Sequence, residues 1–232
     1  PSGQLFLFKS VAGVYTPDTD INDRIAKLVD GGGALTGWEY YDAASENTEL
    51  YDAAGNLLSI TNRAGLSHTL EYSTGATPPS VAPGPGYLIK VTDAFGRELN
   101  FTYDALGRMA SMQDPAGQTY AYTSTSQNHV ATVTYPDGRT RTYVYNETAL
   151  STINIYEGRL TGIVDENNSR FSSYHYNGYG IATRSVLAGG ANDVQVNTTY
   201  GPWTIHVTDA LGTLRTYAYG TANNVYVNTT IT

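Results

Sequence analysis

Apolar and aromatic side chains alternate with polar ones, often threonine, in short stretches along the chain. Residues 140–145, for example, read Thr-Arg-Thr-Tyr-Val-Tyr. Because successive side chains of a strand point to opposite faces, this pattern predicts strands with one aromatic and one polar face. We expect the aromatic face to be the packed one. The aromatic or apolar positions are the fifth and seventh after a glycine, as in Leu70 and Tyr72, Phe101 and Tyr103, Tyr143 and Tyr145, and Tyr217 and Tyr219.

The glycines belong to a turn motif, Asp/Asn-x-x-Gly, which is typical of type I turns. It occurs at residues 30–33, 52–55, 62–65, 93–96, 104–107, 114–117, 177–180 and 209–212. Two looser members are 10–13, with Ser in the first place, and 135–138, with Tyr there. A further unit fits if Ser169 replaces the glycine after one inserted residue, which places Tyr174 and Tyr176 at the aromatic positions.

These turns recur at near multiples of about 10.5 residues, which leaves about six or seven residues for each strand. Helix signals are almost absent, and residues 23–29 are predicted as a strand that pairs with 34–41 through the turn at 30–33. The pattern therefore predicts an all-β protein built as one continuous, twisted antiparallel sheet of strand-turn-strand units. The chain is long enough to bury a substantial core.

We expect a single domain over residues 1–232, because the same repeat continues through most of the chain. Residues 1–37 match the repeat less well and are predicted to form leading strands. Two segments interrupt it, 73–86, rich in Pro and Gly, and 148–158. Both are expected to be insertion loops, since the repeat resumes after each.

Two consecutive units carry a known signature. Residues 91–97 read Val-Thr-Asp-Ala-Phe-Gly-Arg, and residues 101–108 read Phe-Thr-Tyr-Asp-Ala-Leu-Gly-Arg. They resemble the YD repeat of bacterial RHS proteins, and similar units stand at 51–55 and 207–212. The resemblance extends over about residues 38–219.

Membership of that family would imply a sheet that spirals into a hollow cocoon around a toxic C-terminal domain. Relatives include bacterial polymorphic toxins, the B and C components of insecticidal toxin complexes, and the teneurins. The resemblance implies an open, non-catalytic shell segment of a secreted or cell-surface bacterial protein. Its expected partner is the remainder of its own polypeptide, a core region and a C-terminal effector. Unpaired strand edges also favour edge-to-edge self-association.

The family's self-cleaving Asp-Pro-x-Gly-Leu motif is not expected here. Asp114 and Pro115 are followed by Ala116 and Gly117, but Gln118 stands where that motif has Leu. The segment lies within the repeat, so it is predicted to be an ordinary turn.

Charge and composition exclude several partners. The formal net charge of −8 disfavours nucleic acid and anionic membranes. No stretch approaches the roughly 20 apolar residues of a membrane-spanning helix, and the run from Leu5 to Phe8 is too short for the core of a signal peptide. Cysteine is absent, so disulfides and thiolate metal sites are excluded.

No catalytic, cofactor-binding or metal-binding residues are predicted, and the chain is not expected to be an enzyme. Its histidines, at 68, 129, 175 and 206, show no metal-ligand spacing. Asp18, Asp20 and Asn22 resemble the start of a calcium loop, but Asp23 stands where the loop needs Gly and Val29 where it needs Glu. A solvated acidic loop is the better interpretation.

Two other functions remain open. Tyrosines on an exposed sheet could stack on sugars, so the main alternative is a carbohydrate-binding or adhesion module, with glycans as partners. A solenoid enzyme that acts on polysaccharides would need paired carboxylates in one cleft. The only regularly placed carboxylates here belong to the turns.

Overall fold

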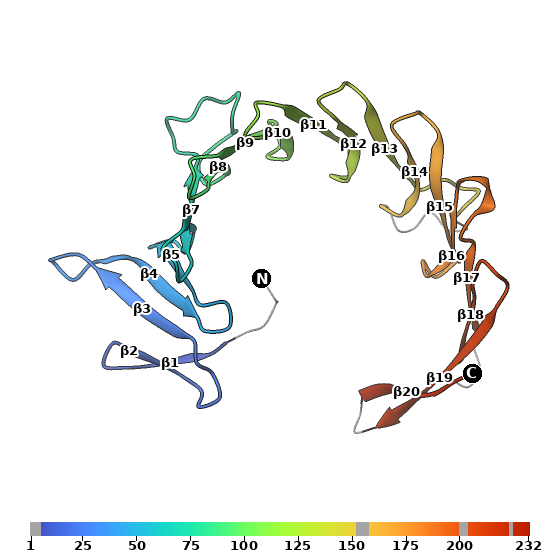
Figure 1. Cartoon of the computed structure of the whole chain (residues 1–232), viewed down its shortest axis with the longest axis horizontal. Coiled ribbons are helices and arrows are strands. Elements are labelled where there is room, and N and C mark those ends of the chain that lie inside the picture. The colour runs from blue at the N-terminus through green and yellow to red at the C-terminus, as the bar shows by residue number, and fades with distance from the viewer. Residues whose placement is uncertain (1–5, 152–157, 200–203, 223–224) are drawn as a thin grey trace. The chain divides into compact units, whose positions relative to one another are not determined.

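A computed structural model describes residues 6–151, 158–199, 204–222 and 225–232 (Figure 1). These residues form twenty strands and one 3₁₀ turn, η1 (Ala188–Gly190). Their contacts divide the chain into two compact units, residues 1–119 and 120–232. Each unit is described by itself, and the single domain stays a prediction.

The first unit contains a hairpin and an antiparallel sheet. The hairpin strands are β1 (Phe8–Val11) and β2 (Val14–Pro17). The sheet strands, each paired with the next, are β3 (Arg24–Val29), β4 (Leu35–Asp42), β5 (Asn47–Asp52), β6 (Leu57–Thr61), β7 (Ser67–Tyr72), β8 (Leu88–Thr92), β9 (Glu98–Tyr103) and β10 (Met109–Gln113).

The second unit is an antiparallel sheet of the same kind. Its strands, again paired in chain order, are β11 (Thr119–Ser124), β12 (Val130–Thr134), β13 (Thr140–Tyr145), β14 (Leu160–Val164), β15 (Arg170–Tyr176), β16 (Ala182–Leu187), β17 (Val194–Thr199), β18 (Thr204–Thr208), β19 (Leu214–Ala222) and β20 (Val225–Ile231). The predicted all-β class and the strand-turn-strand order are confirmed within each unit.

The Asp-x-x-Gly turns share one geometry. At residues 104–108, the Gly107 amide donates to the Asp104 carbonyl over 2.9 Å, and Asp104 Oδ1 accepts the amides of Leu106 and Arg108 at 2.9 and 3.0 Å. Gly107 has a φ of 75°, a conformation that is costly for residues with a Cβ. The same side-chain bonds recur at Asp30, Asp52, Asn62, Asp93, Asp114, Asp165, Asn177 and Asp209.

Two of the predicted turns were wrong in detail. Residues 10–13 do not form an Asp-x-x-Gly turn, because Val11 pairs directly with Val14 and the reversal is made by Ala12 and Gly13 alone, both at positive φ. This two-residue connection suits the right-handed twist of paired strands.

In the other case, Asn168 and not Ser169 takes the glycine's place. Asn168 has a φ of 59° and donates its amide to the Asp165 carbonyl. The additional residue lies in strand β15: Ile163 pairs with Ser172 and Val164 with Arg170, so Phe171 is the extra residue of a bulge. Asparagine tolerates the left-handed conformation better than most residues with a side chain.

The chain is long enough for a substantial core, but the described residues do not form one. Of the described residues, Ala82 is the only buried hydrophobic one, at 2% exposure. The residues of β9 and β13 are half-buried along their whole length. Apart from β4, against which the β1–β2 hairpin packs, the described strands are covered mainly by neighbours on the same face (Figure 1).

The turn carboxylates should make stability depend on pH. Hydrogen bonds lower the pKa of Asp52, Asp93, Asp104 and Asp209, the strongest coming from the Asn56 side chain, the Arg97 amide, the Arg108 side chain and the Thr213 amide respectively. A carboxyl whose pKa is lower in the folded state stabilises fully above its unfolded pKa, about 3.9 for Asp. We therefore expect the melting temperature to fall as the pH drops below about 4.

The matched variant carries Asn at all four of these positions. Asn62 and Asn177 already form the same turn, so the variant should fold while losing the titratable groups. Its melting temperature, followed by circular dichroism between neutral and acidic pH, should change less than that of the unchanged chain. If the melting temperature fell equally with pH in both proteins, these carboxylates would not control stability in acid.

Candidate functional site

At three places, the tyrosine seven residues after a turn glycine forms a repeated contact with the backbone. In β7, β9 and β13 this is the last residue of the strand, and Tyr176 ends β15 in the same way. Its hydroxyl donates to the carbonyl of the first residue of the preceding strand. The bonds are Tyr72 to Leu57 (3.0 Å), Tyr103 to Leu88 (2.7 Å), Tyr145 to Val130 (2.8 Å) and Tyr176 to Leu160 (2.8 Å). We call this contact the tyrosine latch.

Each accepting carbonyl lies next to a β-bulge. Tyr72 pairs with Leu88 and Glu71 with Lys90, so Ile89 is an extra residue directly after the acceptor Leu88. The extra residues after the other acceptors are Leu58, Ala131 and Thr161. A bulge disrupts the ladder locally, and polar backbone groups that it frees need other partners. The latch supplies such a partner at each of these four bulges.

The residue before the acceptor covers the latch ring in three of the four cases. The ring of Tyr87 lies 4.9 Å from that of Tyr103 and the ring of His129 lies 5.1 Å from that of Tyr145, measured between centroids. The Arg159 guanidinium lies 5.7 Å from the centroid of the Tyr176 ring. A planar group therefore lies against each of these three rings.

These covering groups also lie against a glycine. A Cβ on Gly107 would overlap the Tyr87 hydroxyl, and one on Gly180 would overlap the Arg159 guanidinium. By contrast, a Cβ on Gly212 would meet nothing within 4 Å, although its φ is also positive, at 81°. Positive φ thus favours glycine in these turns, and Gly107 and Gly180 also leave space for the group that covers a latch.

Burial keeps the latch hydroxyls protonated. It raises the pKa of Tyr72, Tyr103, Tyr145 and Tyr176 above the usual value for tyrosine. The hydroxyls remain hydrogen-bond donors across the physiological pH range.

The two insertions return to the sheet at equivalent latch residues. The Tyr103 amide donates to the Val81 carbonyl, and the Tyr176 amide, six strands later, donates to the Leu150 carbonyl, both over 2.8 Å. Residues 152–157 of the second insertion lie outside the described residues. The described parts of both segments therefore lie against the ends of latched strands.

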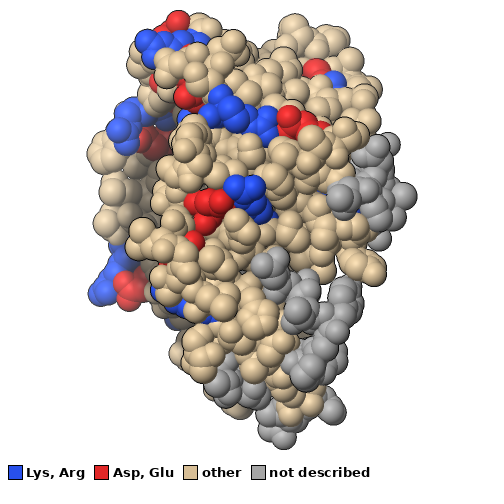
Figure 2. Space-filling view, turned by 90° about the vertical axis from the view of Figure 1, so that its right-hand side faces the viewer, with Lys and Arg blue, Asp and Glu red and all other residues tan. Residues whose placement is uncertain are grey.

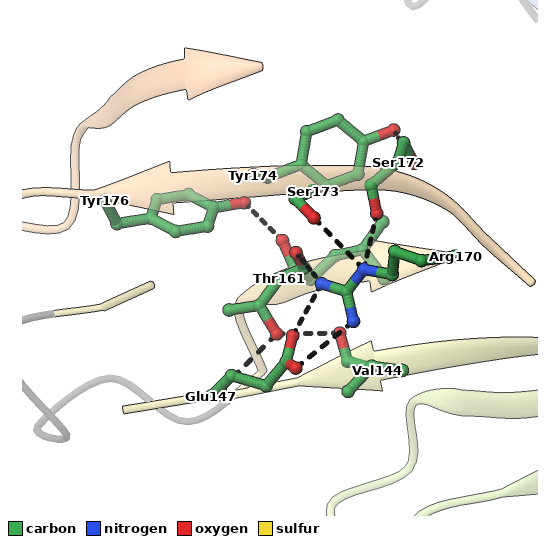
Figure 3. Close-up of polar contacts among 9 residues, drawn as sticks. Val144, Glu147, Thr161, Arg170, Ser172, Ser173, Tyr174 and Tyr176 are labelled. Atoms are coloured by element: carbon green, nitrogen blue, oxygen red, sulfur yellow. Dashed lines mark hydrogen bonds and ion pairs between the residues drawn. The ribbon is translucent and has the colours of Figure 1, made fainter. Parts of the chain in front are cut away.

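Arg170 holds the backbone just before the second insertion through side-chain hydrogen bonds (Figure 3). The Arg170 guanidinium lies over Gly162 and donates to both carboxylate oxygens of Glu147 at 3.1 and 2.7 Å, and to the Thr161 carbonyl at 2.8 Å. Its Nε donates to the Ser172 carbonyl at 2.9 Å. The Arg170 side chain lowers the pKa of Glu147 through this hydrogen-bonded pair. Bidentate pairs of this kind hold a fixed orientation, so the cluster positions the backbone around residue 147.

The histidines considered as candidates lie apart in the structure. His68 is exposed on β7, and His129 covers the Tyr145 ring. Burial lowers the pKa of His175 on β15, and His206 Nδ1 lies 2.9 Å from the Thr216 hydroxyl. In the part of the chain that the structure describes, no group of three or more His, Asp or Glu side chains could hold a metal ion.

The predicted acidic loop connects β2 to β3. Within it, the Ile21 amide donates to the Asp18 carbonyl over 3.0 Å, and the Asp18 carboxylate lies 3.8 Å from Lys9 Nζ. Asp20 and Asn22 line a pocket together with Asp23, which the sequence had singled out only as a mismatch to a calcium loop. Sequence reasoning missed this pocket, because its aromatic wall comes from a hairpin that does not follow the repeat.

Basic and acidic side chains lie beside one another on the face shown in Figure 2. Many arginines are paired with nearby carboxylates. The pairs include Arg97 with Asp93, Arg108 with Asp104, Arg141 with Glu166, and Arg184 with Asp193. Pairing of this kind leaves less unopposed positive charge for a phosphate backbone.

A family model described as RHS Repeat matches residues 86–119, a segment that contains the latch residue Tyr103 and the turns at Asp93 and Asp104. This segment of the chain is therefore similar to the RHS repeat. The resemblance predicted from the sequence is confirmed. No helix among the described residues is long and apolar enough to cross a membrane.

Similar proteins are much longer than this chain. Double-stranded DNA deaminase toxin A of Burkholderia cenocepacia is 28% identical over 140 residues, which cover 60% of this chain and 9% of that protein. A crystal structure of TcdB2-TccC3 without its hypervariable C-terminal region has a TM-score of 0.51 at 13% identity, covering 89% of this chain and 12% of that one. The Photorhabdus luminescens Tc holotoxin pore matches at 15% identity with a TM-score of 0.42, covering 88% of this chain and 12% of that one.

The two kinds of turn glycine should differ in their tolerance of a methyl group. Gly212→Ala places Ala at positive φ in open space and should cost about 1 to 2 kcal/mol of unfolding free energy. Gly107→Ala adds an overlap with the Tyr87 hydroxyl, so it should cost more. Urea unfolding of both variants measures the difference, and equal losses would show that Tyr87 does not lie over Gly107.

The latch bond can be tested on one strand. Tyr145→Phe removes the hydroxyl that donates to Val130 and should lower the free energy of unfolding by about 1 kcal/mol. Tyr143→Phe is the matched control, because no hydrogen bond of the Tyr143 hydroxyl is recorded among the described residues. The control should stay within about 0.5 kcal/mol of the parent. Equal effects in thermal or urea unfolding would exclude a stabilising latch at this position.

Proposed function

We propose that this chain is a non-catalytic wall segment of an RHS shell, which helps to enclose or present a C-terminal effector of the same polypeptide. The observation that carries the proposal is the tyrosine latch. It ties a strand to the backbone of its neighbour, so a sheet can extend strand by strand without the hydrophobic core of a layered domain. A wall needs this property, because one of its faces must remain available to line a space.

The comparisons support this proposal at the level of the family. The relative from Burkholderia cenocepacia is a toxin by name, and the TcdB2-TccC3 structure supports the fold. The aligned region is about a tenth of the length of the relatives reported above. A segment of that size fits a contribution to a wall better than a complete container.

Under this proposal, the ionisable side chains of the turns and of the second insertion stabilise the fold. The turn aspartates bind backbone amides, and Arg170 and Glu147 bind one another. The turn aspartates recur with the repeat, and their bonds to backbone amides account for their positions. The proposal further includes secretion or display on a bacterial surface, and edge-to-edge association of copies.

Carbohydrate binding by the repeat tyrosines has less support. That function needs rings and hydroxyls that are free to meet a sugar. The latch hydroxyls already donate to backbone carbonyls, and the rings of Tyr103, Tyr145 and Tyr176 are covered.

The deciding experiment uses the parent polypeptide. Sequencing of the parent gene beyond Thr232 should reveal a core region and an effector, and limited proteolysis of the purified protein should leave that effector protected. Combining the Tyr72→Phe, Tyr103→Phe, Tyr145→Phe and Tyr176→Phe changes should expose it to protease. The same four-residue change made at Tyr120, Tyr122, Tyr143 and Tyr217 serves as the control.

An effector that is cleaved as readily in the parent as in the latch variant would contradict enclosure. A glycan array on the 232-residue chain provides the second test. Saturable binding to particular sugars, lost when exposed tyrosines are removed without loss of folding, would favour adhesion instead.

A further inference from the structure

A concave pocket of about 1210 Å³ lies in the first unit, beside the β1–β2 hairpin. Two aromatic pairs join the hairpin to β4: Tyr15 contacts Trp38 edge to face at 5.4 Å, and Phe8 contacts Tyr40 at 6.4 Å, between ring centroids. All four side chains line the pocket. The hairpin and the sheet therefore form an aromatic wall that has no counterpart in the repeat units.

Carboxylates line the same space. They belong to Asp20, Asp23, Asp42 and Glu49, and no Lys, Arg or His is present among the described lining residues. Arg24 follows Asp23 in sequence, but its guanidinium lies over the Tyr41 ring, which is not part of the lining. The pocket thus combines aromatic rings with negative charge that its own lining does not neutralise.

Asp23 is the most buried of these acids, with 8% of its surface exposed. One carboxylate oxygen accepts the Tyr40 hydroxyl at 2.5 Å and the other accepts the Ala43 amide at 2.9 Å. Both donors are neutral, and no ion pair of Asp23 is recorded among the described residues. Burying a carboxylate without a cation is costly, and its oxygens can accept further donors.

Glu49 is held similarly. It accepts the hydroxyl of Tyr51, whose pKa is raised to about 12 by burial and by this hydrogen bond. Tyr51 therefore remains a neutral donor, and it adds no positive charge to the pocket. Hydrogen bonds hold both acids in place while leaving the pocket without a cation.

The lining suits an organic cation better than a metal ion. Metal coordination needs several oxygens around one point, and the described residues contain no such group of three. Carboxylates spread around aromatic rings favour a guanidinium or ammonium group, which can lie over a ring and donate hydrogen bonds to the acids. Arginine suits the site well, because its planar guanidinium stacks on rings and donates in several directions.

We propose that this pocket binds an arginine side chain of an extended basic peptide segment. The guanidinium lies against the aromatic wall and pairs with Asp23 and Glu49, and the peptide backbone follows the rim near Asp20. This site is independent of the wall function, because it belongs to the hairpin and not to the latches.

The test is calorimetric titration of the 232-residue chain with a short, unstructured peptide that contains arginine. The same peptide with citrulline in place of arginine keeps the shape of the side chain and removes its charge. Saturable one-to-one binding is expected, at least about tenfold weaker for the citrulline peptide.

A pair of double variants separates the pocket from general attraction to an acidic protein. Asp20→Asn with Glu49→Gln should weaken binding of the arginine peptide by about tenfold. Glu71→Gln with Glu98→Gln removes the same charge around Lys90, outside the pocket, and should change affinity by less than about twofold. Circular dichroism confirms that both variants are folded.

Three outcomes would overturn the proposal. Absence of saturable binding excludes the site, and equal losses in the two double variants show diffuse electrostatic attraction. Binding of a neutral oligosaccharide, such as chitotetraose, in preference to the arginine peptide assigns the pocket to sugars. None of these outcomes affects the protease test of the wall function, which concerns the latches and the downstream effector.

Discussion

The hydrogen bond from a strand-end tyrosine to a carbonyl beside a bulge is the interaction on which this architecture depends. A sheet without a second layer lacks the burial that stabilises sandwiches, and here Ala82 alone forms the buried hydrophobic set of the described residues. The latch stabilises each strand pair locally in place of that burial. It places a large ring over the sheet and gives the carbonyl next to the bulge a donor, as between Tyr103 and Leu88. Repetition of this unit replaces a central core by many small, similar contacts.

The turn and the latch depend on one another. The turn glycine fixes where the next strand begins, and in three of the four latches the tyrosine stands seven residues later. In covered latches the dependence extends to space, since Gly107 accommodates Tyr87 and Gly180 accommodates Arg159. The covering residues differ chemically, but each is planar and each lies on a tyrosine ring. The type of side chain before the acceptor can thus vary while the shape of the repeat unit stays the same.

Much of the fold could be predicted from the sequence, because turns and strand faces are encoded locally. The Asp-x-x-Gly motifs and the spacing of Phe101 and Tyr103 placed the strands correctly. The latch could not be predicted, because its acceptor depends on which residue of the preceding strand is bulged, and that is set by pairing. The same reason explains the error at Ser169: a residue inserted in a turn and one inserted in a strand give the same spacing. The aromatic pocket was also beyond prediction, because it forms between a hairpin and a sheet outside the repeat pattern.

The latch can be observed directly through its hydroxyl protons. A tyrosine hydroxyl that donates to a backbone carbonyl exchanges its proton with water slowly, and the proton becomes visible by nuclear magnetic resonance in a chain with labelled tyrosine. The account predicts slowly exchanging hydroxyl protons for Tyr72, Tyr103, Tyr145 and Tyr176, and rapid exchange for Tyr143. Exchange at the four latch positions as rapid as at Tyr143 would contradict it.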